Sequence, residues 1–263
     1  YFGWLISDPS SLVREAALDG LNRPFVVANS SPDSGVDLEL MTNVAMKFLK
    51  RIAGCAIDKE ASVQPHAMTL LLSLLREGFL DELEDDALWD QINFKALDPS
   101  ATPEMRRTAL EFIIEQLEAF ADDEEVEGAV GVTGGDAERI VVLKIDALAS
   151  WVAHAFTGGD EKQDLGEMNL QLTDLLVESL KAIPEHSYIT TDWSSMLRVI
   201  NEDSVATTAN NNTADRATDA AKQLVLMRML MASVKMEVGK VGAADFLLGL
   251  SFKAAAVNKK SET

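Results

Sequence analysis

The sequence of 263 residues predicts an all-α fold, and three observations predict it. Apolar residues recur at helical spacing along most of the chain, for example at Val44, Phe48, Ile52 and Cys55. Aromatic residues make up only 6%, and alternating runs of Val and Thr, which are typical of strands, are scarce. Hydrophobic residues make up 47%, which excludes a disordered chain and is enough to build a core.

Turn-forming residues divide the chain at intervals that suit pairs of helices. We expect breaks at residues 23–24, 29–35, 58–64, 98–103, 128–136, 157–160, 183–188 and 203–215. The run from Ile140 to Leu143 would also suit a strand, but Ile145, Leu148 and Val152 continue it at helical spacing, which predicts a helix. Residues 201–215 contain three consecutive asparagines, so a disordered loop is expected there.

Three segments that read as turns before a helix resemble one another, one near the start of the chain and two among the breaks given above. They begin at Asp8, Asp58 and Asp98, so the starts lie 50 and 40 residues apart. These separations bracket the ~40 to 47 residue period of HEAT-type helix pairs. In such a turn a short aspartate caps the next helix, and an arginine six to eight residues on can reach back toward it. Either these are repeats or helix starts resemble one another by chance.

The repeat interpretation predicts an α-solenoid of HEAT-like antiparallel helix pairs, with about five to six repeats. We divide it into residues 1–128, near-neutral and then acidic, and residues 129–263, which hold further helical repeats. Among residues 1–76, seven Lys or Arg face eight acidic residues, a net charge of −1, so the remainder carries −19 of the total of −20. This balance excludes a protein that wraps nucleic acid over its whole surface.

No pattern of catalytic residues is found in the sequence. There is no His-Glu-x-x-His, no Cys-x-x-Cys and no phosphate-binding Gly-Lys-Ser or Gly-Lys-Thr, and His66, His154 and His186 fall in separate segments. Cys55 lies on the apolar face of its predicted helix, which indicates a buried structural thiol. We therefore expect a protein that is not an enzyme and holds no cofactor and no metal. No apolar run approaches the ~18 residues that cross a membrane.

Two groups of residues in the near-neutral first third are candidates for binding. Lys47, Lys50 and Arg51 are spaced to form one basic stripe on a helix, which either contacts phosphate or pairs with neighbouring acids. Trp4 and Phe48 are large aromatics in successive predicted repeats. They either belong to the core or line the groove that solenoids use for extended peptides.

Several motifs resemble the stromal antigen, or stromalin, family of cohesin subunits. The segment Tyr1-Phe2-Gly3-Trp4, with Asp8 and Val13-Arg14 behind it, resembles that family's Tyr-x-Gly-Trp, Asp and Val-Arg stretch at matching spacing. The segment from Lys47 to Ile52 resembles its Arg-Phe-Lys-x-Arg-Ile helix, and Asp192-Trp193-Ser194-Ser195-Met196 resembles an Asp-Trp-x-x-Met element. The similarity is specific up to about Leu117, weaker to about Met236, and absent beyond.

The resemblance implies a non-enzymatic HEAT solenoid that binds the kleisin subunit of cohesin in sister-chromatid cohesion, on chromosomes in the nucleus. It implies a pocket for short aromatic motifs of regulators, such as shugoshin and a zinc-finger insulator protein, formed here by Tyr1, Trp4, Val44, Lys47 and Phe48. Val44 stands where the family has an aromatic and Lys47 where it has Arg, which weakens a bidentate contact to a carboxylate. The resemblance also implies DNA contacts, for which the candidates are Arg14, Lys50 and Arg51.

A carrier of nuclear transport, of the karyopherin type, is the alternative. Such a carrier is also an acidic HEAT solenoid, and its carboxylates would receive Lys-rich cargo. The net charge of −20 favours this alternative, whereas the Tyr-Phe-Gly-Trp start and the Lys47 to Ile52 stripe favour the first. An enzyme of unfamiliar type is a more distant rival.

Overall fold

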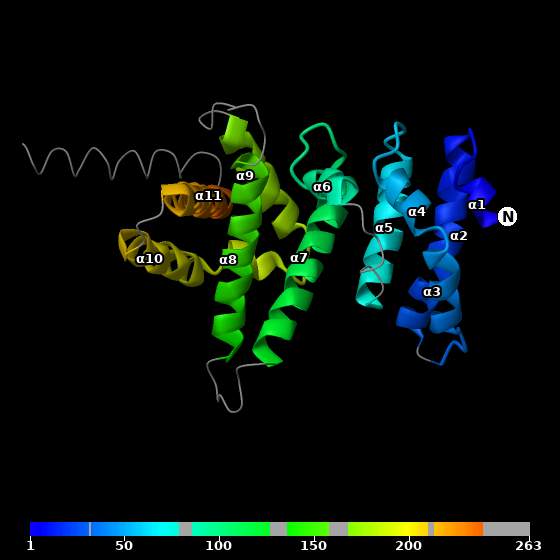
Figure 1. Cartoon of the computed structure of the whole chain (residues 1–263), viewed down its shortest axis with the longest axis horizontal. Coiled ribbons are helices and arrows are strands. Elements are labelled where there is room, and N and C mark those ends of the chain that lie inside the picture. The colour runs from blue at the N-terminus through cyan, green and yellow to red at the C-terminus, as the bar shows by residue number, and fades with distance from the viewer. Residues whose placement is uncertain (32, 79–85, 127–135, 158–167, 210–212, 239–263) are drawn as a thin grey trace, which may run out of the picture. The chain divides into compact units, whose positions relative to one another are not determined.

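The computed structural model describes residues 1–31, 33–78, 86–126, 136–157, 168–209 and 213–238. These residues form α-helices and one short 3₁₀ helix, and none of them forms a strand, so the predicted all-α class is confirmed. Figure 1 shows the helices in chain order. Within the ranges described, no helix is both long enough and apolar enough to cross a membrane.

The chain divides into two compact units, Tyr1–Thr133 and Gly134–Thr263. The first unit contains α1 (Phe2–Leu5), α2 (Ser11–Ser30), α3 (Leu38–Met46), α4 (Leu49–Ala56), α5 (Val63–Arg76), α6 (Asp86–Phe94) and α7 (Pro103–Val126). The second contains α8 (Asp136–Thr157), α9 (Met168–Lys181), η1 (Ser187–Thr190), α10 (Trp193–Ala209) and α11 (Thr213–Val238).

Helix α5 is the centre of the first unit. It packs against α2, α4 and α7, so it is covered on several sides (Figure 1). Leu70, Leu71 and Leu74 of α5 have no exposed surface, and Phe25 of α2 and Phe112 of α7 are buried beside the same core. A helix surrounded in this way needs apolar residues on most of its circumference, which explains why five of the six residues 70–75 are leucines.

Helix α11 has the corresponding place in the second unit, where it packs against α8, α9 and α10. Leu148 and Val152 of α8, Leu176 of α9 and Met229 of α11 are fully buried. Residues 140–143 belong to α8, so the helical interpretation of that run is confirmed.

The three similar turns make the same contacts. The Oδ1 atoms of Asp8, Asp58 and Asp98 accept the N–H of the residue two positions on, at 2.8, 2.9 and 2.9 Å. A side chain of the next helix then returns to a turn carbonyl: Arg14 to Asp8 O at 2.7 Å, Gln64 to Asp58 O at 2.6 Å, and Arg106 to Ala101 O at 2.5 Å. In each turn the returning side chain bonds to a backbone carbonyl of its own turn, and the aspartate carboxylate of that turn accepts a turn N–H.

The break expected at residues 23–24 is wrong, and the one expected at 203–215 is narrower, since α10 ends at Ala209 and α11 begins at Thr213. Helix α2 continues through Pro24, although proline removes the N–H that would bond to the Gly20 carbonyl. Leu21 and Phe25 on either side of Pro24 are buried, and their packing holds the helix together. Residues 201–209 and 213–215 are helical rather than a disordered loop, because α10 and α11 extend into them. The expected turns at 128–135 and 158–160 lie outside the described residues.

Candidate peptide-binding site

Helix α1 lies against the start of α4, and Gly3 makes this close approach possible. A Cβ atom at Gly3 would stand 2.7 Å from the Phe48 ring and 2.9 Å from Nη1 of Arg51. The Gly3 carbonyl accepts a hydrogen bond from Arg51 Nη1 at 2.5 Å and another from Ser7 Oγ at 3.3 Å. The backbone of α1 is thus fixed to a residue 48 positions away in the sequence.

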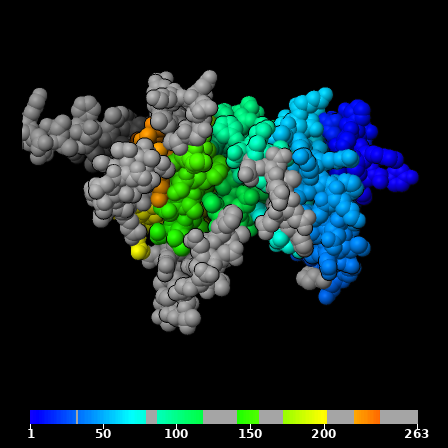
Figure 2. Space-filling view, viewed as in Figure 1, coloured from blue at the N-terminus to red at the C-terminus, as the bar shows by residue number. Residues whose placement is uncertain are grey.

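The side chains next to this contact point into solvent. Trp4 is 77% exposed and Tyr1 is 97% exposed, and their rings meet edge to face with centroids 5.9 Å apart. Leu12 near the start of α2 is also exposed. In Figure 2 the dark-blue N-terminal residues lie at the surface of the first unit. Trp4 is therefore not a core residue, and leaving so much aromatic surface in water is unfavourable unless a partner covers it.

The helix that was expected to carry Val44, Lys47 and Phe48 is interrupted between them. Helix α3 ends at Met46, Lys47 is its exposed C-cap, and α4 begins after Phe48. The Phe48 N–H bonds to Ala45 O at 2.9 Å, a tighter spacing than the α-helix uses. Val44 and Phe48 are each partly buried, and Phe48 faces Gly3. The three residues predicted to form one basic stripe therefore do not share a helix, because Lys47 lies in the turn and Lys50 and Arg51 lie in α4.

The three candidates for DNA contacts lie in different surroundings. Lys50 is exposed on α4, and Arg51 is exposed but bonded to Gly3. Arg14 is only 6% exposed: Nη1 donates to Asp8 O and Nη2 donates to Asp58 Oδ1 at 2.9 Å. A guanidinium that is buried and hydrogen-bonded in this way is not available to phosphate. Arg14 is therefore excluded from the candidates for DNA contacts. It joins two successive turns instead.

Cys55 lies beneath this site and is buried, as expected. Its Sγ lies 3.7 Å from the Ile6 carbonyl oxygen. Burial, assisted by the nearby Asp58 carboxylate and opposed by Arg14, raises the pKa of the Cys55 thiol to about 11. A thiol with such a pKa stays protonated at neutral pH, so it is a poor nucleophile and a poor metal ligand.

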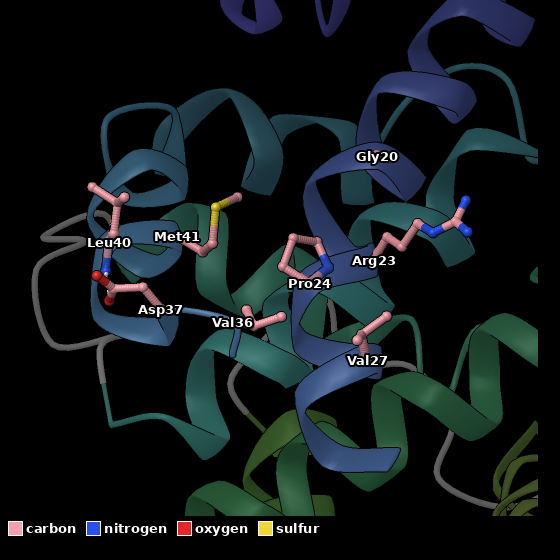
Figure 3. Close-up of a pocket in the computed structure, with 8 residues that line it drawn as sticks. All are labelled: Gly20, Arg23, Pro24, Val27, Val36, Asp37, Leu40 and Met41. Atoms are coloured by element: carbon pink, nitrogen blue, oxygen red, sulfur yellow. Dashed lines mark hydrogen bonds between the residues drawn. The ribbon is translucent and has the colours of Figure 1, made fainter. Parts of the chain in front are cut away.

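One surface feature was missed by sequence reasoning, an apolar groove between α2 and α3. Its volume is about 400 Å³ (Figure 3). The lining residues are Gly20, Arg23, Pro24, Val27, Val36, Asp37, Leu40 and Met41. The sequence predicts a helix break at residues 23–24, whereas the continuous helix α2 places Gly20, Pro24 and Val27 along one side of the groove. The helical spacing of these residues was the available signal.

Searches for metal sites and for relatives gave negative results. Over the ranges that the structure describes, no three His, Cys, Asp or Glu side chains group so that they could hold a metal ion. Comparison of the chain with protein-family models, with curated proteins and with solved structures found no match.

Proposed function

We propose that this chain is a non-enzymatic scaffold of the stromalin type, part of a cohesin complex, that binds short aromatic peptide motifs beside α1. In this proposal the chain also binds the kleisin subunit and acts in the nucleus on chromosomes. The observation that carries the proposal is the exposed pair Tyr1 and Trp4, supported by the fixed contact of Gly3 with Phe48 and Arg51.

The proposed site has the features of a peptide anchor. Exposed Trp and Tyr side chains contribute most of the binding energy in many interfaces, because they bury a large area and have few rotatable bonds. The backbone that carries Trp4 is held by Arg51 and by the packing of Phe48 on Gly3. Little ordering of α1 is then required when a peptide binds, which favours affinity.

The proposal includes a helical solenoid. Its support is the set of equivalent turns at Asp8, Asp58 and Asp98, together with the connection from Arg14 of one turn to Asp58 of the next. In a solenoid each unit contacts its neighbours and leaves an extended surface for a chain such as kleisin.

The test is a fluorescence-anisotropy titration of a labelled shugoshin-type aromatic peptide against the 263-residue chain. We expect saturable binding that Trp4→Ala and Phe48→Glu each weaken by about tenfold or more, as expected for anchor residues. Met231→Ala is the matched control, since Met231 is a half-exposed apolar residue of the second unit. Circular dichroism melting shows which variants are folded.

Two results would count against the proposal. The first is a folded wild-type protein that does not bind the aromatic peptide. The second is a pair of folded Trp4 and Phe48 variants that bind the peptide as tightly as the Met231→Ala control. Salt-dependent binding of a Lys-rich localisation peptide, in the absence of aromatic-peptide binding, would instead favour the nuclear-transport carrier.

A further inference from the structure

The groove between α2 and α3 is lined by other residues than those of the candidate site beside α1. Figure 3 shows Pro24 and Val27 on the α2 side, Leu40 and Met41 on α3, and Val36 in the segment between them. Val27 is 39% exposed and Leu40 is 58% exposed. A volume of about 400 Å³ is in the range of sites that hold small ligands or several side chains.

Two charged residues of opposite sign stand on the two sides of this groove. Arg23 belongs to α2 and Asp37 precedes α3, and in Figure 3 their charged groups point outward on opposite sides. Arg23 is exposed, and its side chain makes no hydrogen bond or ion pair with any residue that the structure describes. Asp37 uses Oδ1 to accept the Leu40 N–H at 2.9 Å, so it caps α3.

This arrangement defines the chemistry of a complementary partner. The apolar lining of the groove favours a bulky apolar side chain of the partner, because burying that side chain removes apolar surface of both partners from water. Arg23 favours a carboxylate next to that side chain, through the planar fork of its guanidinium. Asp37 favours a Lys or Arg on the opposite side.

From these features we infer that the α2–α3 groove binds a segment of another protein in which one bulky apolar residue lies between an acidic and a basic residue. The acidic residue lies over Arg23 and the basic residue over Asp37. The two opposite rim charges set the direction of the bound segment. A second copy of this chain, or an uncharged apolar ligand, is not the expected occupant.

The test uses methyl NMR of the whole 263-residue chain with labelled methionine methyl groups. Met41 lines the groove, and half-exposed Met231 of the second unit is the internal control. Met41→Leu assigns the reporter signal. The probes are three blocked five-residue peptides: Lys-Ser-Leu-Ser-Glu, the same peptide with Ser in place of Leu, and the same peptide with Lys in place of Glu.

We expect the first peptide to shift the Met41 signal saturably at millimolar concentration while Met231 stays unchanged. The Ser peptide shifts neither signal, and the peptide with two lysines binds about three to five times more weakly, the effect of one exposed ion pair. Arg23→Glu reverses the preference between the two leucine peptides. Arg107→Glu is the matched control, an exposed arginine of α7 outside the groove.

A second variant tests the groove itself. Leu40→Asp puts a charge on an exposed position of α3 without removing the Asp37 cap, and we expect it to abolish the Met41 shift in a folded protein. The inference is overturned if the Ser peptide shifts Met41 equally, if Arg23→Glu leaves the preference unchanged, or if no peptide shifts Met41. It is also overturned if the Met41 signal moves with protein concentration alone, which would assign the groove to a second copy.

Discussion

At the residue scale, Gly3 decides how closely α1 approaches α4. A Cβ atom there meets the rigid Phe48 ring at 2.7 Å and the Arg51 guanidinium at 2.9 Å, so one of the helices has to move. We expect Gly3→Ala to lower the free energy of unfolding by about 1–3 kcal/mol, the usual cost of an overpacked contact. It also weakens aromatic-peptide binding, because the support of Trp4 is displaced. Urea denaturation and the anisotropy titration measure the two effects.

Gly54 is the matched control for this substitution. It lies within α4, is exposed, and a Cβ atom added there meets nothing within 4 Å. Gly54→Ala should therefore stabilise the protein by about 0.5–1 kcal/mol, because alanine loses less conformational freedom in a helix. Equal effects of the two substitutions would contradict the close approach at Gly3.

The Cys55 thiol makes stability depend on pH in the alkaline range. Its pKa is raised from 9.0 to about 11 in the folded protein, chiefly by burial, so between these values the unfolded chain has lost a proton that the folded chain keeps. Stability from this group is complete below pH 9 and falls as pH rises toward 11, by roughly 2–3 kcal/mol. The measurement is urea denaturation at pH 8 and pH 10.5 for wild type and Cys55→Ala. Lys and Tyr titrate in both proteins, so the thiol contribution is the difference between them. If the free energy of unfolding falls as steeply with pH in Cys55→Ala as in the wild type, the raised pKa is contradicted.

At the element scale, the joint between the first two similar turns depends on Arg14. The side chains of Arg14 and Asp58 are 7% and 13% exposed, and Arg14 also donates to the carbonyls of Asp8 and Pro9. Removal of Arg14 leaves the largely buried Asp58 carboxylate with the Glu60 N–H as its remaining partner, so Arg14→Ala should cost about 3 kcal/mol in urea denaturation.

The comparison is with Arg76→Ala, which removes a surface ion pair of α5 with Glu111 and Glu115. The Arg76 side chain is 42% exposed, and exposed pairs contribute about 0–1 kcal/mol. The double variant Arg14→Ala/Asp58→Ala should be less destabilised than the sum of its single variants. If Arg14→Ala lowers the free energy of unfolding only as much as Arg76→Ala does, the Arg14–Asp58 ion pair behaves as a solvated surface pair.

The helices were predictable from sequence because their signals are local. Leu148 and Val152 are buried at the helical spacing that predicted them, and Asp8, Asp58 and Asp98 form turns where their similarity placed them. The interruption between α3 and α4 was not predictable, since no glycine or proline marks it. It depends on the packing of Phe48 against Gly3, which is a contact between distant segments.

The candidate site was predictable only in part, for the same reason. The motif placed Trp4 and Phe48 in one region, but exposure of Trp4 and burial of Arg14 follow from how α1, α2 and α4 pack. A charged residue in a turn motif is equally compatible with a surface contact and with a structural ion pair. The buried carboxylate of Asp58, 44 residues away, decides between them.

At the scale of the whole molecule, the net charge of −20 opposes binding to DNA. Of the cations expected to contact phosphate, Arg14 is buried and Arg51 is bonded to Gly3. Lys50 is exposed on α4, and Lys47 is exposed close by in sequence. A contact made by about two cations gives a slope near −2 in a plot of log affinity against log salt concentration. We therefore expect the affinity for a DNA duplex to fall about tenfold between 50 and 200 mM salt, which an anisotropy titration measures.

The control for this prediction is a pair of variants with equal net charge. Lys47→Glu/Lys50→Glu changes two exposed lysines, one before α4 and one in its first turn, whereas Arg23→Glu/Arg107→Glu changes two exposed arginines elsewhere in the same unit. If DNA binds locally at Lys47 and Lys50, only the double variant of these lysines loses DNA binding and its dependence on salt concentration. An equal loss in both pairs would show that DNA responds only to the total charge, and the proposed scaffold would then contact chromatin through its protein partners alone.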